Sequence, residues 1–161
     1  LMETMAKYAQ AAVAMASRDR LDMVYLDVVQ GEANMTMRRQ IGTRLPLHLS
    51  SAGRACLAAM PGSEREFMLE HIRQRHLEDW PTIRKGLERA FRDYTDFGYC
   101  MSIGEWHRDV NAIAVPMLHT QHGLLTFNCG GPSFHLSREK LEDDIGPRLK
   151  HMVNNIEAAA R

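Results

Sequence analysis

The sequence predicts a single α+β domain in which helices pack on an antiparallel sheet. The expected elements come in the order helix, two strands, three helices, three strands and helix, so strands and helices form runs. The last two strands are separated only by residues 119–123 (HTQHG), a length suited to a hairpin between antiparallel neighbours. A doubly wound nucleotide-binding fold requires alternating strands and helices, so we do not expect one.

The chain is expected to begin in a helix. Apolar residues recur there at helical spacing, at Met2, Met5, Ala9, Ala12 or Val13, and Ala16. Nothing before them resembles a helix cap. We therefore expect residues 1–20 to be the end of a linker helix from a longer protein, and residues 21–161 to form the domain.

Two strands are predicted next. Residues 23–29 (MVYLDVV) are rich in β-branched and aromatic side chains, and residues 33–40 (ANMTMRRQ) follow a short turn around Gly31 and Glu32. In the second strand Met35 and Met37 alternate with polar residues, which gives it one apolar face.

Three helices are expected between these strands and the next. The first covers residues 50–60, with Ser50 or Ser51 as its N-cap. The second covers residues 63–75 and would open with a capping box of Ser63 and Glu66. The third covers residues 82–96 and would stop at Gly98.

From residue 99 onward the alternation of side chains has a period of two, which is typical of strands. Strands are predicted at residues 99–103, 110–118 and 124–130. In the last of them Leu125, Phe127 and Cys129 share one face, while Thr126, Asn128 and Gly130 share the other, and Val110, Ala112 and Ala114 form a similar face of small residues. A final helix starts at Ser137, and Gly146-Pro147 should kink or split it.

Charge and composition exclude several classes of function. Lys and Arg together number 20, as do Asp and Glu, so this chain has no net positive charge with which to bind nucleic acid by itself. No apolar run approaches the roughly 18 residues that span a bilayer, and no secretory leader is visible. The three cysteines are far apart and odd in number, which favours reduced thiols in a cytoplasmic protein.

Metal and nucleophile patterns are weak. The eight histidines form no cluster with cysteine or carboxylate at a zinc spacing, so we expect no metal and no cofactor, although ligands from distant residues stay possible. Cys56 and Cys129 fall on apolar faces and resemble buried small hydrophobes more than nucleophiles. Ser51 lacks the G-x-S-x-G pattern of a nucleophile elbow. Gly130-Gly131-Pro132 is compatible with either a backbone anion nest or a sharp turn.

Three segments carry a resemblance to a known family. RLPLHLSSAGRACLAAMP (residues 44–61), DFGYCMSIGEWHRDVNAIAVPM (96–117) and GLLTFNCGGPSFHLSREKLEDDIGPRL (123–149) are similar, in order and spacing, to the IclR family of bacterial transcription regulators. The resemblance is to its C-terminal effector-binding domain and covers nearly the whole chain. It implies a GAF-like fold, a curved antiparallel sheet flanked by helices with a small-molecule pocket. It also implies an N-terminal winged helix-turn-helix, which this chain does not contain.

The resemblance also implies where an effector would bind. Carried over position by position, the effector-binding residues would be Met37, Leu45, Ser51, Ala52, Ser102, Val110, Ala112, Asn128 and Gly130. Small-acid sensors of the family tend to have Asp near Ser102 and Ser at the positions of Asn128 and Gly130, so a different effector is expected here. Glu105 could serve as a pocket group or as a structural acceptor, and the structural role is favoured.

Small residues at 50–53, where the first of the three helices begins, fit this interpretation. A helix N-terminus exposes unpaired N–H groups and the positive end of the helix dipole, which suits a carboxylate. Close packing of the helix on the sheet would require small residues equally.

The expected function is that of a non-enzymatic sensor. A small organic acid would bind the domain, shift the arrangement of a homodimer or homotetramer, and so control operator binding by the missing N-terminal domain, with no membrane involved. Two alternatives stay open: an oligomerisation module with a vestigial pocket, and a small enzyme on a GAF-like scaffold.

Overall fold

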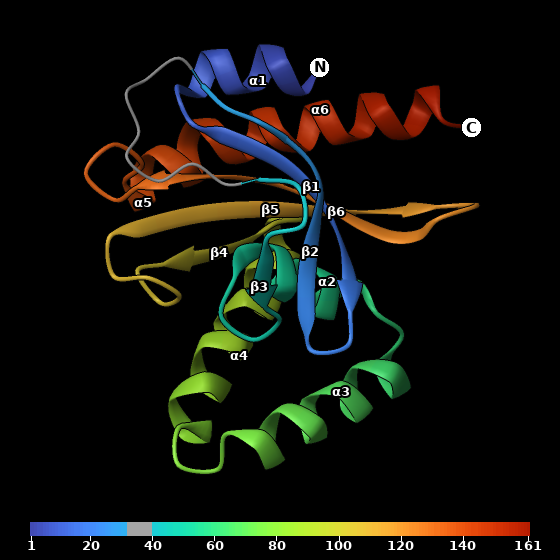
Figure 1. The fold of residues 1–161 in the computed structure, drawn as a ribbon, viewed down its shortest axis with the longest axis vertical. Helices are drawn as coiled ribbons and strands as arrows, with labels where there is room; N and C mark the ends of the chain where they lie inside the picture. The colour runs from blue at the N-terminus through green and yellow to red at the C-terminus, as the bar shows by residue number, and fades with distance from the viewer. Residues whose placement is uncertain (32–39) are drawn as a thin grey trace.

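The computed structural model describes residues 1–31 and 40–161, which form an α+β domain around one six-stranded antiparallel sheet (Figure 1). The strand order is β3-β2-β1-β6-β5-β4, and each neighbouring pair is antiparallel. The strands are β1 (Ala12–Asp19), β2 (Asp22–Val29), β3 (Arg44–Pro46), β4 (Cys100–Ile103), β5 (Val110–His119) and β6 (Gly123–Pro132). The β1–β6 pair joins the N-terminal and C-terminal parts of the chain at the centre of the sheet. The predicted α+β class is confirmed.

Helices cover both faces of the sheet. On one face, α1 (Met2–Ala9) and α6 (Gly146–Ala159) lie side by side (Figure 1). On the other, α2 (Ser51–Ala59) packs directly on the strands, and α3 (Gly62–Arg75) and α4 (Trp80–Phe97) lie outside it. No helix of the described residues is long and apolar enough to span a bilayer.

The strands alternate between these two layers as their period of two requires. On β6, Leu125, Phe127 and Cys129 belong to the apolar cluster beneath α1 and α6. Asn128 and Gly130 face the side of α2, where they line a cavity. The predicted division of this strand into two faces is therefore confirmed.

The expected helix at the start of the chain is wrong beyond Ala9. Gln10 adopts a left-handed conformation with φ 52°, which ends α1, and Ala12–Asp19 forms strand β1. Because β1 lies between β2 and β6 and is covered on both faces, its sequence AVAMAS shows no alternation of polar and apolar residues. An alanine-rich buried strand of this kind also fits a helical pattern. That residues 1–20 end a linker helix from a longer protein stays a prediction for α1 alone. The boundary expected at residue 21 comes too late, because β1 is a central strand of the domain's sheet.

Two further predictions change. The strand expected at residues 33–40 falls almost wholly outside the described residues, and Gln40, the described part, is in no strand. Besides β1, β2 pairs with the short β3, which was expected to be a break in the chain around Pro46. The capping box of Ser63 and Glu66 is wrong, because Pro61 occupies the N-cap of α3 and Ser63 lies inside the helix.

Other helix ends form as expected. Ser50 caps α2, and its Oγ accepts a hydrogen bond from the Gly53 N–H at 3.0 Å. Gly98 ends α4 with φ 84°. Before Gly146 the last helix is split: α5 (Arg138–Lys140), capped by Ser137, continues into a π-helical turn (Leu141–Ile145) and then into α6.

Small side chains let α2 approach the sheet closely. A Cβ added to Gly53 would lie 2.2 Å from the carbonyl oxygen of Leu47, so no larger residue fits there. Further along the helix, Ala55 and Ala58 pack against Ala90 of α4 and Ala114 of β5. Close packing, one of the two explanations for the small residues of this segment, thus applies to Ala55 and Ala58. Gly53 is small for a different reason, its contact with Leu47 in the turn before α2.

A buried ion pair fixes α2 to the outer strands. The side chain of Arg54 is 1% exposed, and its Nη2 donates to Glu105 Oε2 at 2.7 Å. Its Nη1 donates to the carbonyl of Met101 at 3.1 Å and its Nε to that of His48 at 3.2 Å. Glu105 Oε1 accepts from Arg89 at 3.0 Å and from the backbone N–H of Ile103. Each of the three guanidinium nitrogens of this buried charge thus donates a hydrogen bond, as burial requires.

Glu105 is a carboxylate in this arrangement. Burial alone raises the pKa of Glu105, but the hydrogen bond from Arg54 and the charges of Arg54 and Arg89 hold that pKa below its usual range. The structural role favoured from the sequence is the one that the structure shows.

Replacing Glu105 by glutamine should therefore lower stability. Glu105→Gln leaves the buried Arg54 guanidinium without its counter-charge, and we expect a loss of about 2 kcal/mol in the free energy of unfolding, measured by urea denaturation. Glu70→Gln is the matched control, because Glu70 pairs with Arg73 on the exposed surface of α3, and it should leave the midpoint nearly unchanged. Equal effects of the two substitutions would contradict this account.

His48 makes stability depend on pH. The residue is 7% exposed, and the centroid of its ring lies 4.4 Å from that of His76. Burial, followed by the charges of His76 and Arg54, lowers the pKa of His48 to about 4. An unfolded histidine titrates near 6.5, so between about pH 6.5 and 4 the unfolded state binds more protons and stability falls as the pH falls.

His48→Gln should reduce this dependence. From pH 7 to pH 5 the wild type should lose about 1 kcal/mol more than the variant, after allowance for solvent screening. Urea denaturation at the two pH values measures the difference. His71→Gln, on the exposed side of α3, serves as the control and should behave as the wild type does; an identical loss in His48→Gln would refute the assignment.

Candidate functional site

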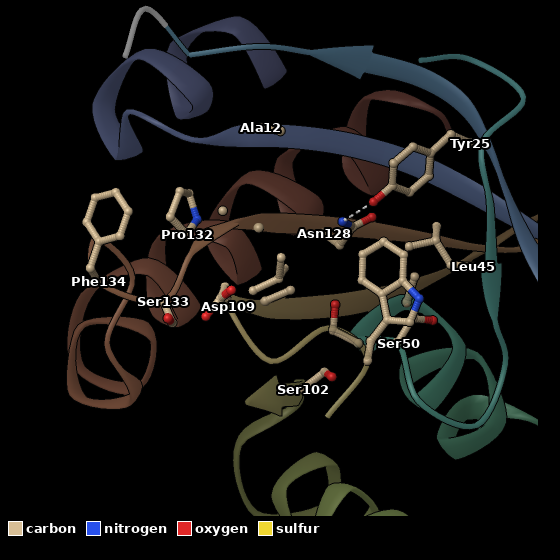
Figure 2. A pocket seen from close by; sticks show the side chains of 17 residues that line it. Ala12, Tyr25, Leu45, Ser50, Ser102, Asp109, Asn128, Pro132, Ser133 and Phe134 are labelled. Carbon is tan, nitrogen blue, oxygen red and sulfur yellow. Dashed lines mark hydrogen bonds between the residues drawn. The ribbon is translucent and has the colours of Figure 1, made fainter. Parts of the chain in front are cut away.

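A cavity of about 430 Å³ opens between the first turn of α2 and the facing strands (Figure 2). This volume lies in the range of about 300–1,000 Å³ typical of small-molecule sites. Its floor comes from β5 and β6, and its sides come from β1, β2, β3, β4 and α2. Two loops form the remaining wall, residues 104–109 after β4 and residues 133–137 after β6.

Eight of the nine predicted effector residues line this cavity. They are Leu45, Ser51, Ala52, Ser102, Val110, Ala112, Asn128 and Gly130. The ninth, Met37, lies outside the described residues. Sequence positions as far apart as 45 and 130 therefore meet around one space, although their expected role in binding an effector stays a prediction.

Several lining residues were missed from the sequence. Tyr25, Ser50, Trp106, Asp109 and Phe134 all face the cavity, together with Ala12 of β1 and residues 131–133. Tyr25 could have been found, because in strand β2 it alternates with Val24 and shares a face with Met23. The loop residues Trp106, Asp109 and Phe134 give no periodic signal, since their direction depends on the loop conformation.

The first turn of α2 presents unused backbone donors to the cavity. Ser50 Oγ satisfies the N–H of Gly53, and the Ser50 carbonyl accepts from Arg54 N–H. No residue that the structure describes accepts a hydrogen bond from the N–H of Ser51 or Ala52. These two groups and the helix dipole make this end of the cavity electropositive.

A buried amide lies on the opposite wall. Asn128 Nδ2 donates to Tyr25 Oη at 3.0 Å, drawn as the dashed line in Figure 2. Its Oδ1 is buried and accepts no hydrogen bond from the described residues. A buried carbonyl oxygen without a donor is uncommon in folded proteins, so this atom marks a position where a donor is missing.

The two loops at the mouth are tied together. The backbone N–H of Ser133 donates to the carbonyl of Asp109 at 2.8 Å. Phe134 stands beside this contact at the end of the cavity remote from Leu45, and it is 92% exposed (Figure 2). The only lining carboxylate among the described residues, that of Asp109, is at this exposed edge.

The lining is suited to binding a small molecule. Among the described residues it contains no histidine, lysine, arginine or cysteine. Burial raises the pKa of the thiols of Cys56, Cys100 and Cys129, that of Cys56 to about 11, so the described cysteines are protonated at neutral pH. Nowhere in residues 1–31 and 40–161 do three or more His, Cys, Asp or Glu side chains gather as metal ligands would.

Comparison with known proteins identifies the family. The model for the C-terminal region of the bacterial transcriptional regulator IclR matches residues 1–158. The HTH-type transcriptional regulator TsaQ1/TsaQ2 of Comamonas testosteroni is 32% identical over 163 residues, which cover 99% of this chain and 59% of that protein.

Solved structures agree on the fold. An IclR family transcriptional regulator from Brucella abortus is 72% identical, with a TM-score of 0.97 over 99% of this chain and 61% of that one. The inducer binding domain of the PobR transcription factor from Acinetobacter, a double mutant in complex with 3-hydroxy benzoic acid, is 20% identical with a TM-score of 0.74, over 96% of this chain and 94% of that one. This last likeness shows the fold alone.

The chain thus spans about three fifths of the length of TsaQ1/TsaQ2 and of the Brucella regulator, 59% and 61% respectively. The family match covers nearly all of the residues present, and the relatives are named transcriptional regulators. The chain belongs to the IclR family of bacterial transcriptional regulators and corresponds to its C-terminal effector domain.

Proposed function

We propose that this domain binds a small organic acid in the cavity at α2 and that it is a sensor rather than an enzyme. The observation that carries the proposal is the pair of unused N–H groups of Ser51 and Ala52, which line the α2 side of a 430 Å³ cavity. A carboxylate placed there would accept hydrogen bonds from both groups and would lie at the positive end of the helix dipole.

The size and lining of the cavity favour an acid with an apolar body. Leu45, Ala52, Val110 and Ala112 supply apolar walls, and Trp106 and Tyr25 supply aromatic ones. The PobR inducer binding domain, which shares this fold, holds a hydroxybenzoic acid in its solved complex. A short aliphatic acid or a single-ring aromatic acid would both be accommodated by this combination of groups.

Regulation would follow from a population shift. An acid that binds one arrangement of a dimer or tetramer more tightly than another changes how attached DNA-binding domains sit on an operator, with a coupling free energy of about 1–3 kcal/mol. The partners of this chain would then be the acid, further copies of itself, and operator DNA contacted in the cytoplasm through an N-terminal domain.

Acids and the matching carboxamides should bind this domain with different affinities. We expect benzoates, short keto acids or short hydroxy acids to raise the melting temperature saturably, because a ligand of the folded state stabilises it once its concentration exceeds Kd. The matching carboxamides should bind at least about 10-fold more weakly, since they bring no anion to the N–H groups of Ser51 and Ala52.

Ala52→Leu should fill the anion end of the cavity and remove binding of every acid. Ala59→Leu, in the last turn of the same helix and away from the cavity, is the control and should bind as the wild type does. Absence of any saturable shift in the wild type would favour an oligomerisation module with a vestigial pocket, and equal binding of acids and amides would place the anion site elsewhere.

The proposed control of DNA binding can be tested by measuring the coupling between acid binding and DNA binding in both directions. In a full-length regulator that carries this domain, a DNA fragment selected for binding should change the Kd of the acid by the same factor, about 5- to 150-fold, by which the acid changes the Kd of the DNA. Calorimetry of the acid with and without DNA measures one factor, and DNA titrations with and without acid measure the other. Independence of the two equilibria would refute control by population shift.

A further inference from the structure

We infer that the cavity selects acids by the charge at their far end, and that Asp109 is the residue that makes this selection. An acid whose distal group is a cation, such as an ammonium, binds best, one with a neutral end binds less well, and a dicarboxylate binds worst. This inference rests on the proposed function and specifies the chemical class of its ligand further.

Asp109 is the one charged residue in the described lining of the cavity. It is exposed and ends the loop after β4, immediately before β5. In Figure 2 it lies beside Ser133 and Phe134 toward one end of the cavity, whereas Ser50 and Leu45 lie toward the other. The hydrogen bond of 2.8 Å from the Ser133 N–H to the Asp109 carbonyl holds the two loops together at this end.

The carboxylate of Asp109 is not used by the fold. Only the backbone carbonyl of this residue takes part in the contact with Ser133, and within residues 1–31 and 40–161 no cation or N–H group is bonded to its side chain. Glu105, by contrast, has a structural role and is paired with both Arg54 and Arg89. An unpaired carboxylate at the mouth of a cavity is available to interact with what the cavity holds.

The two ends of the cavity therefore have opposite polarity. The start of α2 presents the N–H groups of Ser51 and Ala52 and attracts an anion, while the Asp109 end attracts a cation and repels a second anion. β5 runs from the Asp109 end and lines the cavity with the apolar Val110 and Ala112. An acid that places its carboxylate at α2 and is long enough to span the cavity directs its distal group toward Asp109.

The exposed side chains at this end decide the sign and the size of the preference. Phe134 lines the same end, and an aromatic ring attracts a nearby cation through its quadrupole but does not attract a carboxylate. Asp109 and Phe134 are both exposed, and water and salt screen an exposed charge. We therefore expect a preference of modest size that depends on salt.

Three matched series of ligands test the inference on the unaltered domain at low salt. The cationic acids are 3- and 4-(aminomethyl)benzoate and 5-aminopentanoate. The neutral acids of the same length are 3- and 4-ethylbenzoate and hexanoate, and the diacids are isophthalate, terephthalate and glutarate. In at least one series, calorimetry should give the cationic acid a Kd at least about 5-fold lower than that of the diacid, with the neutral acid between them.

Asp109→Asn should remove this order of affinities. The amide keeps the shape of the side chain and the backbone contact with Ser133 but carries no charge. We expect the cationic acid to bind more weakly and the diacid more tightly, until their Kd values agree within about twofold, while the neutral acid is unchanged. Asp96→Asn, in the exposed last turn of α4 and away from the cavity, removes the same charge from the chain and should keep the order.

Salt gives a second readout, which a change of shape at residue 109 would not affect. Raising the ionic strength from about 0.01 M to about 1 M shortens the Debye length from about 30 Å to about 3 Å. The ratio of the two Kd values, diacid to cationic acid, should fall in the wild type toward the ratio measured for Asp109→Asn. In that variant the ratio should stay nearly constant.

The failures of the two proposals are distinguishable. If acids bind and the matching carboxamides do not, but the three kinds of distal group bind alike, the inference is wrong and the proposed function stands. The same holds if the diacids bind best, if Asp109→Asn keeps the order, or if the preference is unchanged at high salt. If no acid binds at all, the proposed function is wrong and the inference with it.

Discussion

The buried guanidinium of Arg54 is the interaction on which the arrangement of the site depends. It lies on α2 one turn beyond the N-cap and bonds to the carbonyl before α2, to the carbonyl of Met101 on β4, and to Glu105 in the following loop. Glu105 extends the connection to Arg89 on α4. Three regions of the chain, residues 48–54, 89 and 101–105, are therefore held together around one charge that cannot be left unpaired in the interior.

This connection explains how a cavity can persist next to a tightly packed helix. Gly53 brings α2 against the backbone of Leu47, and Gly86 leaves room for the guanidinium, since a Cβ there would lie 2.6 Å from Arg54 Nη2. These contacts position the helix from behind. Its first turn is left facing the sheet across an open space, where Ala112 and Gly130 carry too little side chain to close the gap.

Much of this architecture could be predicted from the sequence, and the reasons for the errors are physical. Capping residues placed α2, an amphipathic period placed α4, and a period of two placed the three C-terminal strands, whose two faces carry side chains of different character. β1 was missed because it is central and buried on both faces, so AVAMAS has no polar side to reveal a period of two. Ser63 was misassigned because Pro61, fixed in φ, begins α3 without a side-chain cap.

The residues of the site likewise fall into a group that the sequence could predict and a group that it could not. Family resemblance and strand period brought together Ser102, Ala112 and Asn128, whose directions follow from regular structure. Trp106, Asp109 and Phe134 could not be predicted, because they reach the cavity from loops whose path depends on tertiary contacts such as that of Ser133 N–H with Asp109. A structural acceptor role was favoured for Glu105, but the ion pair with Arg54 could not be predicted from spacing, since 51 residues separate the two.

The packing of Gly53 has a consequence for how such a domain can diversify. The α2 side of the cavity offers main-chain N–H groups, which no amino-acid substitution other than proline removes. The opposite side offers the side chains of Ala112, Val110 and Asn128, each of which a single codon change can enlarge, shrink or recharge. One wall is therefore held constant by the geometry of the backbone, and the other is open to drift and selection. A lineage built on this frame can acquire new chemical preferences one strand position at a time without dismantling the part of the site that all of its members would share.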